Sequence, residues 1–379
     1  MTSASALLLW TVNVTCHYSP SPHVSVRFYV FALGHLAIGG LGLFGNAMAV
    51  LVFSRQSMHS GNAEFLRALA CSDILLILAA IALYAVEILY EYFRDIQLYR
   101  AWHAYLRECF LLSHIAHAAG IYLTVAASLE RYLCIRRHGS PYESPESRCS
   151  PLSARATILL IIVTMSALTL SKYWEVRVER LEHCGQFAGL RVAQGRLLED
   201  PLYVRLSVWL STLLLSFLPF LLLLLLNLAI LWRSATEGIC ASASLTSTPW
   251  IARMQMRARR ARQREMTKTL LVIVFVFLFC NFPSILINIA ELFLRPQLEA
   301  RPVLYSFSRD AVNLLTVINS TANSVVYFCM SSRYRKELRH LWNPKPTKLT
   351  RKNALSTLRQ PSEHQPLTKS KHKAANGFC

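Results

Sequence analysis

Seven apolar runs, each about as long as a membrane-crossing helix, constrain the fold of this chain more than any other feature. About 20 apolar helical residues cross the hydrocarbon core, where helices or closed barrels alone satisfy the backbone hydrogen bonds. A hydrophobic content of 54% and a charged content of 16% also indicate a membrane protein. We therefore predict an all-α membrane protein, a seven-transmembrane helix bundle. The predicted spans are residues 28–53, 65–90, 110–135, 156–174, 203–232, 270–294 and 303–330.

The net charge of +19 is concentrated on one side of the predicted membrane. Residues 54–63, 131–155, 232–269 and 331–379 hold 26 Lys and Arg against 6 Asp and Glu, or +20, and the rest of the chain holds 14 against 15, or −1. Basic loops mark the cytoplasmic side of a multi-pass protein. The pattern predicts an extracellular N-terminus and a cytoplasmic C-terminus, and it explains the positive charge without a nucleic-acid partner.

The segments that flank the bundle differ in composition. Residues 1–26 form a predicted extracellular segment, which lacks the basic leader of a cleaved signal peptide and carries the glycosylation acceptor Asn13 in "NVT". Residues 27–330 are the predicted membrane domain. Residues 331–342, "SSRYRKELRHLW", have the pattern of an amphipathic juxtamembrane helix, and residues 343–379 that of a disordered cytoplasmic tail. The stretch "RMQMRARRARQREMTK" predicts a basic helical extension of the sixth span.

Polar residues inside the spans are candidates for function, because a charge at bilayer depth costs about 3 kcal/mol or more and needs a partner. Asp73 lies in the middle of the second span, and Asn46, Asn319 and Asn323 lie on other spans. Such a cluster either holds the bundle together or forms a cation site or a switch. The sequence leaves both roles open.

Glu130 and Arg131 stand side by side in "SLERYLCIRR", at the cytoplasmic end of the third span. Adjacent residues on a helix point about 100° apart, yet long side chains can meet at the membrane edge, where a partly desolvated ion pair is strong. The pair is either a plain interfacial anchor or a functional element.

The chain carries no pattern typical of an enzyme. It has no Gly-rich phosphate loop, no nucleophile elbow and no metal-spaced Cys/His set. His114 and His117, three residues apart, hint at a metal site but lack an evident third ligand. We expect no enzymatic activity, no cofactor and no metal. A membrane transporter is a weaker alternative, because the sequence shows neither repeat symmetry nor a pair of broken helices.

Six motifs in order make the chain resemble the rhodopsin-like (class A) G protein-coupled receptors from about residue 28 to residue 342. They are "FGNAMAV", "LACSD", "ERY", "FLPFLLLLLLN", "FLFCNFP" and "NSTANSVVY". The "CNFP" sequence and the last motif without its proline narrow the resemblance to the FMRFamide-receptor-like neuropeptide receptors. Asn281 stands where the family usually has tryptophan, and Ser324 stands where it usually has proline.

The resemblance implies a set of activation-switch residues. Glu130 would restrain Arg131 at rest, and Arg131 would meet a Gα subunit after the sixth span moves outward about a hinge at Pro283. Tyr327 would turn inward in the active form. The implied set is Asn46, Asp73, Glu130, Arg131, Tyr132, Pro219, Asn281, Pro283, Asn319, Asn323 and Tyr327. Gly120 replaces a serine found in many relatives, which weakens the expectation of a sodium ion near Asp73.

The resemblance also implies a disulfide between Cys109 and Cys184, joining the third span to the second outer loop. Cys109 lies about one helical turn closer to "ERY" than in the family, and pairing with Cys16 is the rival arrangement.

Members of this family bind their agonists in the outer half of the bundle. Aminergic relatives carry an aspartate where this chain has Ser113, so a biogenic amine is disfavoured. The ligand candidates are Tyr84, Glu87, Glu91, Ser113, His114, His117, Asn288, Glu291 and Asn313. Each alone fits a solvated or structural role better than a ligand contact, but together the acids suit a short amidated, basic peptide, such as arginine followed by an amidated aromatic residue.

The implied partners are an extracellular peptide ligand and a heterotrimeric G protein at the plasma membrane. Arrestin, receptor kinases and membrane lipids are further candidates. An orphan or ligand-independent receptor of the same fold is the alternative.

Overall fold

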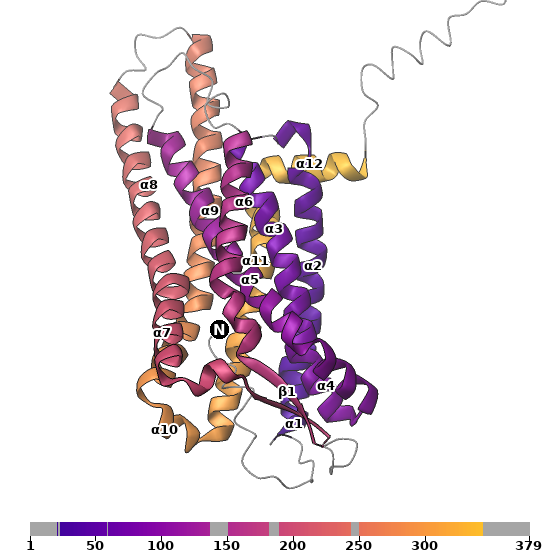
Figure 1. Ribbon diagram of the computed structural model, residues 1–379. Helices are drawn as coiled ribbons and strands as arrows, with labels where there is room; N and C mark the ends of the chain where they lie inside the picture. The colour runs from indigo at the N-terminus through magenta and orange to yellow at the C-terminus, as the bar shows by residue number, and fades with distance from the viewer. Residues whose placement is uncertain are drawn as a thin grey trace, which may run out of the picture. The chain divides into compact units, whose positions relative to one another are not determined.

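The computed structural model describes residues 21, 23–58, 60–136, 151–181, 189–243 and 250–343 (Figure 1). Within these residues, six helical segments are long and apolar enough to span a membrane: Val24–Phe53, Gly61–Phe93, Ile96–Leu133, Ser153–Trp174, Pro201–Arg233 and Leu271–Glu291. Helix α11 (Pro302–Met330) counts as a seventh span when taken together with α12 (Ser332–Trp342), the helix that follows it. The prediction of a seven-span helical bundle is confirmed.

Most spans are composed of several helical pieces. The elements before the strands β1 (Val176–Arg180) and β2 (Leu190–Gln194) are α1 (Val24–Arg27), η1 (Phe28–Ala32), α2 (Leu33–Phe53), η2 (Gln56–Met58), α3 (Gly61–Ala80), η3 (Ile81–Ala85), α4 (Val86–Phe93), α5 (Ile96–Arg136), α6 (Pro151–Thr169) and η4 (Leu170–Trp174). Those after them are η5 (Arg196–Glu199), α7 (Pro201–Ser211), η6 (Thr212–Phe217), α8 (Leu218–Ala243), α9 (Trp250–Phe293), α10 (Arg295–Glu299), α11 and α12. The turns η1, η3 and η6 are π-helical, a feature often found near functional sites.

The third span starts well before the boundary predicted from hydropathy. Helix α5 begins at Ile96, whereas the predicted span begins at residue 110. The extra turns carry Arg and Glu and are therefore too polar for a hydropathy window, but Tyr99, Trp102 and Leu106 within them are buried against the second span. Tertiary packing of aromatic side chains extends the helix beyond the apolar run.

A two-stranded hairpin that the sequence analysis did not predict follows η4. Strands β1 (Val176–Arg180) and β2 (Leu190–Gln194) pair antiparallel, with Val178 opposite Val192. Val176 and Val192 are buried in the same cluster as Trp102 and Leu106, so the hairpin packs on the early turns of α5. Figure 1 shows this hairpin at the same end of the bundle as α1, α4 and α10, which we call the outer end.

Helix α2 approaches α3 and α11 closely because its glycines face these helices. A Cβ on Gly45 would lie 2.8 Å from the Ser324 Cβ of α11, and one on Gly42 would lie 2.7 Å from the Ile77 Cδ1 of α3. A bulkier residue at either place would push the helices apart. This close contact brings Asn46 within reach of α11.

The chain groups into two compact units, Met1–Arg335 and Lys336–Cys379. The spans and the hairpin belong to the first unit. The second begins within α12, and its residues beyond Asn343 lie outside the described part of the chain. The division into segments 1–26, 27–330, 331–342 and 343–379 stays a prediction.

Candidate functional site

A buried guanidinium connects the first, second and seventh spans at the outer end. Arg27 is 5% exposed, and it donates from Nε to Asp310 Oδ2 at 2.7 Å and from Nη2 to Asp310 Oδ1 at 3.2 Å. Its Nη1 donates to Ser21 Oγ at 2.8 Å and to Glu91 Oε2 at 3.3 Å. The fork of Arg27 thus matches one carboxylate bidentately and a second one singly, the strongest type of charge-assisted contact.

A second ion pair lies at the same end. Arg309 Nη1 lies 3.2 Å from Glu291 Oε1, which also accepts a hydrogen bond from the Tyr305 hydroxyl. Glu87 lies one turn before Glu91 and is half-buried. It interacts electrostatically with Arg27 but accepts no hydrogen bond from the described residues.

We call these six charged residues the acidic cluster: Arg27 and Arg309 with Glu87, Glu91, Glu291 and Asp310. Tyr84, on the π turn η3, interacts electrostatically with Arg309 of the second ion pair and with Glu87 and Asp310 near Arg27. Four carboxylates against two guanidiniums leave a balance of −2 among the described residues. An excess of negative charge in a region of reduced dielectric attracts a further cation.

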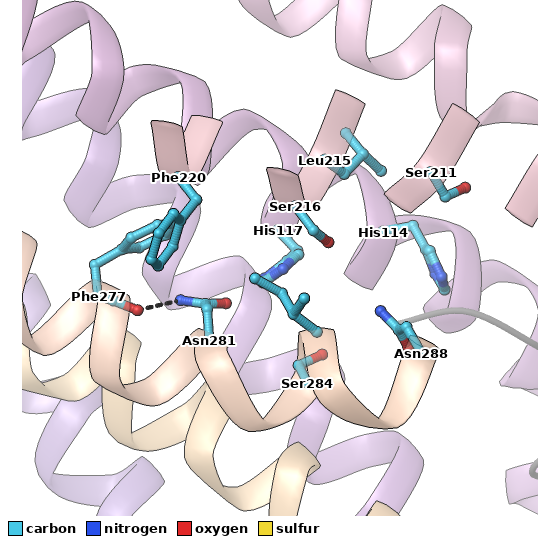
Figure 2. A pocket seen from close by; sticks show the side chains of 11 residues that line it. His114, His117, Ser211, Leu215, Ser216, Phe220, Phe277, Asn281, Ser284 and Asn288 are labelled. Atoms are coloured by element: carbon cyan, nitrogen blue, oxygen red, sulfur yellow. Dashed lines mark hydrogen bonds between the residues drawn. The ribbon is translucent and has the colours of Figure 1, made fainter. Parts of the chain in front are cut away.

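A cavity that is partly open to solvent, with about 540 Å³ of empty space when the open solvent is included, lies between the third, fifth and sixth spans (Figure 2). Its lining comprises His114, His117, Ser211, Leu215, Ser216, Phe220, Phe277, Asn281, Ser284, Ile285 and Asn288. Figure 2 shows His114 and Asn288 turned toward each other across the cavity. Asn281 Nδ2 donates to the Phe277 carbonyl at 2.8 Å, which fixes the amide against its own helix.

Many of the side chains that line this cavity are polar, but none of them is a carboxylate or a guanidinium. Two imidazoles, three hydroxyls and two amides supply hydrogen-bond donors and acceptors, and two phenyl rings supply aromatic surface. The π turn η6 contributes Leu215 and Ser216. Such a lining suits a neutral amide attached to an aromatic ring better than it suits a free charge.

A second cavity, with about 330 Å³ of empty space when the open solvent is included, is lined by Asp73 together with Asn319, Ser320 and Asn323. Asn323 Nδ2 donates to Asp73 Oδ2 at 2.9 Å, and Asn46 Nδ2 donates to the Ser320 carbonyl at 3.0 Å. The expected polar meeting of the second and seventh spans is therefore present in the structure, with Asn46 bound to α11 rather than to the aspartate. Its role as a switch stays a prediction.

His117 and Phe277 line both cavities. The outer cavity and the Asp73 cavity are therefore separated by the side chains of one histidine and one phenylalanine. Asn281 stands one turn above Phe277 on α9. A movement of the His117 or Phe277 side chain caused in the outer cavity would therefore also change the surroundings of Asp73.

At the opposite end, Glu130, Arg131 and Tyr132 lie half-buried near the end of α5, with Tyr132 packed on Ile230 of α8. Tyr327 is 2% exposed and meets the Phe53 ring edge-on, with centroids 5.2 Å apart. Its hydroxyl has no hydrogen-bond partner among the described residues. A buried hydroxyl without a partner costs free energy, so a movement that gives it one is favoured.

The two expected prolines of the switch set lie inside helices. Pro219 is buried near the start of α8, just after the π turn η6, and Pro283 lies inside the continuous helix α9.

The structure separates the ligand candidates into two groups. Tyr84, Glu87, Glu91 and Glu291 lie in or beside the acidic cluster, and His114, His117 and Asn288 line the outer cavity. Ser113 is fully buried and donates to the Phe110 carbonyl at 2.8 Å, and Asn313 is half-buried on α11; neither lines the outer cavity.

Three charged residues of the acidic cluster were missed by the sequence analysis: Arg27, Arg309 and Asp310. The signal was present, because Arg309 and Asp310 lie within the predicted seventh span and a charge there needs a partner. Arg27 stands immediately before the first apolar run, where basic residues that flank a span are common, so its sequence position did not indicate a buried ion pair.

Several predicted features lie wholly or partly outside the described residues. Asn13, Cys16 and Cys184 are outside. Cys109 is described, half-buried in α5, and forms no disulfide with another described cysteine. The described residues also contain no group of three His, Cys, Asp or Glu arranged to hold a metal.

The sequence was compared with protein families and with known proteins, and it matches both. The sequence matches the family profile "7 transmembrane receptor (rhodopsin family)" over residues 45–327. It is 26% identical over 327 residues to the FMRFamide receptor of Drosophila melanogaster, a match to 82% of this chain that spans about half, 53%, of that relative. It is also 26% identical over 317 residues to the FMRFamide peptide receptor frpr-18 of Caenorhabditis elegans, covering 82% of this chain and 68% of the relative.

A solved structure shows the same fold. The crystal structure of squid rhodopsin superposes with a TM-score of 0.67 at 14% sequence identity, covering 91% of this chain and 95% of that one.

Proposed function

This chain belongs to the rhodopsin family of seven-transmembrane receptors, and we propose that it responds to a short amidated, basic peptide outside the cell. Members of this family are multi-pass receptors of the plasma membrane rather than enzymes or transporters. The observation that carries the proposal is the acidic cluster, with its excess of two negative charges, beside an outer cavity of neutral polar and aromatic side chains.

The acidic cluster accounts for the basic part of the ligand. Arg27 and Arg309 are already engaged with Asp310, Glu91 and Glu291, whereas Glu87 accepts no hydrogen bond from the described residues. A guanidinium from a ligand would supply the missing cation and find at Glu87 a carboxylate with lone pairs to share.

The outer cavity accounts for an amidated aromatic residue. Its amide and imidazole groups can bind a terminal carboxamide, and Phe220 and Phe277 can pack against a ring. Asn288 of the cavity and Glu291 of the acidic cluster are three residues apart on α9, so they are neighbours on one helical face. Adjacent arginine and aromatic residues of one peptide would therefore reach both sites. The names of the two FMRFamide receptors agree with this ligand class.

Ligand binding would reach the G protein through His117 and Phe277. A peptide that displaces either side chain changes the wall of the Asp73 cavity. The Asp73–Asn323 hydrogen bond connects that cavity to α11, where Tyr327 has a buried hydroxyl in need of a partner. We infer that α9 then moves outward and exposes Arg131 to a Gα subunit.

The remaining expectations belong to the same proposal. The basic loops support a cytoplasmic C-terminus and an extracellular N-terminus, on which Asn13 would be a glycosylation site. Cys109 and Cys184 would join the third span to the second outer loop. Arrestin, receptor kinases and anionic lipids would act on the cytoplasmic face.

The test is a G-protein activation assay on cells that express the full chain. Amidated peptides ending in Arg-Phe are compared with analogues that carry citrulline in place of arginine, on the wild type and on Glu87→Gln. We expect Glu87→Gln to lower the potency of the arginine peptide about tenfold, near 1.4 kcal/mol, and to change that of the citrulline analogue much less. Arg131→Ala should abolish the response.

Glu108→Gln is the matched control, because Glu108 is an exposed carboxylate of α5 outside the acidic cluster. An equal loss of potency for both peptides on Glu87→Gln would refute the guanidinium site. Silence to every amidated peptide, with normal surface expression, would make the chain an orphan receptor.

A further inference from the structure

Glu265, on the cytoplasmic extension of α9, binds the first turn of α12. Its Oε1 accepts a hydrogen bond from the Ser332 backbone N–H, and its Oε2 accepts one from Ser332 Oγ at 2.8 Å. Both carboxylate oxygens of one residue on the extension of the sixth span thus bind a residue that follows the seventh span.

This contact is favourable for a general reason. The first N–H groups of a helix have no partner within the helix, and the helix dipole places partial positive charge there. A carboxylate therefore satisfies the N-terminus of α12 by both hydrogen bonding and charge. Ser331 Oγ accepts from the Tyr334 N–H at 3.2 Å, so the chain itself satisfies another of these groups.

The start of α12 is fixed to parts of the bundle other than α9. Tyr334 is 2% exposed and packs on Phe53 and Tyr327, with ring centroids 5.8 Å and 6.0 Å away. Arg335 Nη1 donates to the carbonyls of Phe328 at 3.0 Å and Cys329 at 2.6 Å, at the end of α11. These contacts leave the first turn of α12 in place when α9 moves.

The sequence around Glu265 makes its charge distinctive. Residues 253–268 contain seven Arg and Lys, and Glu265 is the single acid among them. In a stretch that is otherwise positive, this carboxylate is the group able to bind a helix N-terminus. The basic neighbours could not replace it.

We propose that Glu265 is a positioning residue that latches the cytoplasmic end of the sixth span to the start of α12 in the resting receptor. The inference rests on the proposed function, because outward movement of α9 is the step that would break the contact. The latch makes the resting position of α9 depend on one carboxylate and one serine. Removing either favours the active form without a ligand.

The first test measures ligand-independent G-protein activation by the full chain. Glu265→Gln should raise basal activity several-fold at equal surface expression. Ser332→Asp should do the same, because an aspartate in the first turn of α12 is still favoured by the helix dipole but repels Glu265. This variant separates the latch from a role in merely stabilising α12. Glu337→Gln, which removes an acid from a later turn of α12, is the matched control and should leave basal activity unchanged.

Two outcomes would overturn the latch. One is wild-type basal activity in both Glu265→Gln and Ser332→Asp. The other is an equal rise in Glu337→Gln, which would show a general effect of charge.

A second measurement does not depend on signalling. Spin-labelled non-natural residues at Ser54 and Met254, both exposed, report the distance between the end of α2 and the cytoplasmic part of α9 in the purified, unliganded chain. Glu265→Gln should populate longer distances than the wild type, and an unchanged distribution would refute the latch. If no G protein is activated under any condition, the proposed function fails and this measurement still decides the latch.

Discussion

Arg27 and Glu87 lie in the same acidic cluster, yet their neutralisation should change the stability of the unliganded receptor in opposite directions. Arg27→Gln leaves Asp310 and Glu91 without the guanidinium that binds them at 2.7 Å and 3.3 Å, and Glu87 adds a third carboxylate nearby. Glu87→Gln removes one of the two excess negative charges and breaks no hydrogen bond among the described residues. The first change increases repulsion and the second relieves it.

The magnitudes follow from these contacts. Breaking a buried ion pair by removing one partner costs about 3–5 kcal/mol, so Arg27→Gln should reach that range. Asp310→Asn should cost less, about 1–2 kcal/mol, because an amide oxygen still accepts from Arg27 and Arg27 keeps Glu91. Glu87→Gln should stabilise the receptor by about 1 kcal/mol, because it removes the desolvation cost of a partly buried carboxylate and its repulsion from Glu91 and Asp310, which together exceed its attraction to Arg27.

The assay is thermal unfolding of the purified, ligand-free chain in detergent. With about 2–4 °C per kcal/mol for a large domain, Arg27→Gln should lower the midpoint by roughly 6 °C or more and Glu87→Gln should raise it by about 2–4 °C. Glu108→Gln controls for the loss of an exposed carboxylate. A destabilising Glu87→Gln, or an Arg27→Gln no worse than Asp310→Asn, would refute the charge balance assigned to the cluster.

Three further changes test other parts of the structure. Gly45→Ala should lower stability by about 1–3 kcal/mol because its Cβ would collide with α11, whereas Gly40→Ala, where a Cβ meets nothing within 4 Å, should be neutral or slightly stabilising in the same thermal assay. Asn281→Trp should fill part of the outer cavity and lower peptide affinity about tenfold or more in a binding assay; unchanged affinity would place the ligand elsewhere. Hydrogen bonds from Arg191, and secondly from Arg177, lower the pKa of the half-buried Glu179 carboxyl, so its contribution to hairpin stability is present above the ordinary carboxyl pKa and is lost as pH falls through the lowered value. Hydrogen exchange of the hairpin should therefore be slower in the wild type than in Glu179→Gln at neutral pH and equal in acid, and a difference that persists in acid would contradict the assignment.

Hydropathy predicted the bundle because hydrocarbon imposes a local requirement on each segment. Every run of apolar residues must form a helix, whatever its neighbours do. The same rule failed at the start of the third span, where polar turns are held in the helix by Tyr99, Trp102 and Leu106 packing on other elements. It also missed the outer hairpin, whose Val176 and Val192 are buried in the same cluster as these turns of α5.

The candidate site was predicted in part for a similar reason. His114, His117 and Asn288 could be selected because they are polar residues in apolar spans, and they do line one cavity. Glu87, Glu91 and Glu291 were grouped with them as one ligand set, whereas the structure places these acids in a separate cluster with Arg27, Arg309 and Asp310. The sequence contained no information on how each helix is rotated about its axis, which decides the grouping.

The number of spans, their order, the side that carries the positive charge and the family motifs were determined by the sequence alone, because each depends on composition or spacing within a short segment. Which charges meet was decided by tertiary structure. Arg27 binds Asp310 across 283 residues, and Glu265 binds Ser332 across 67. Such pairs depend on the rotation and vertical register of packed helices, and these are set by side-chain contacts over the whole bundle, including the close approach at Gly45.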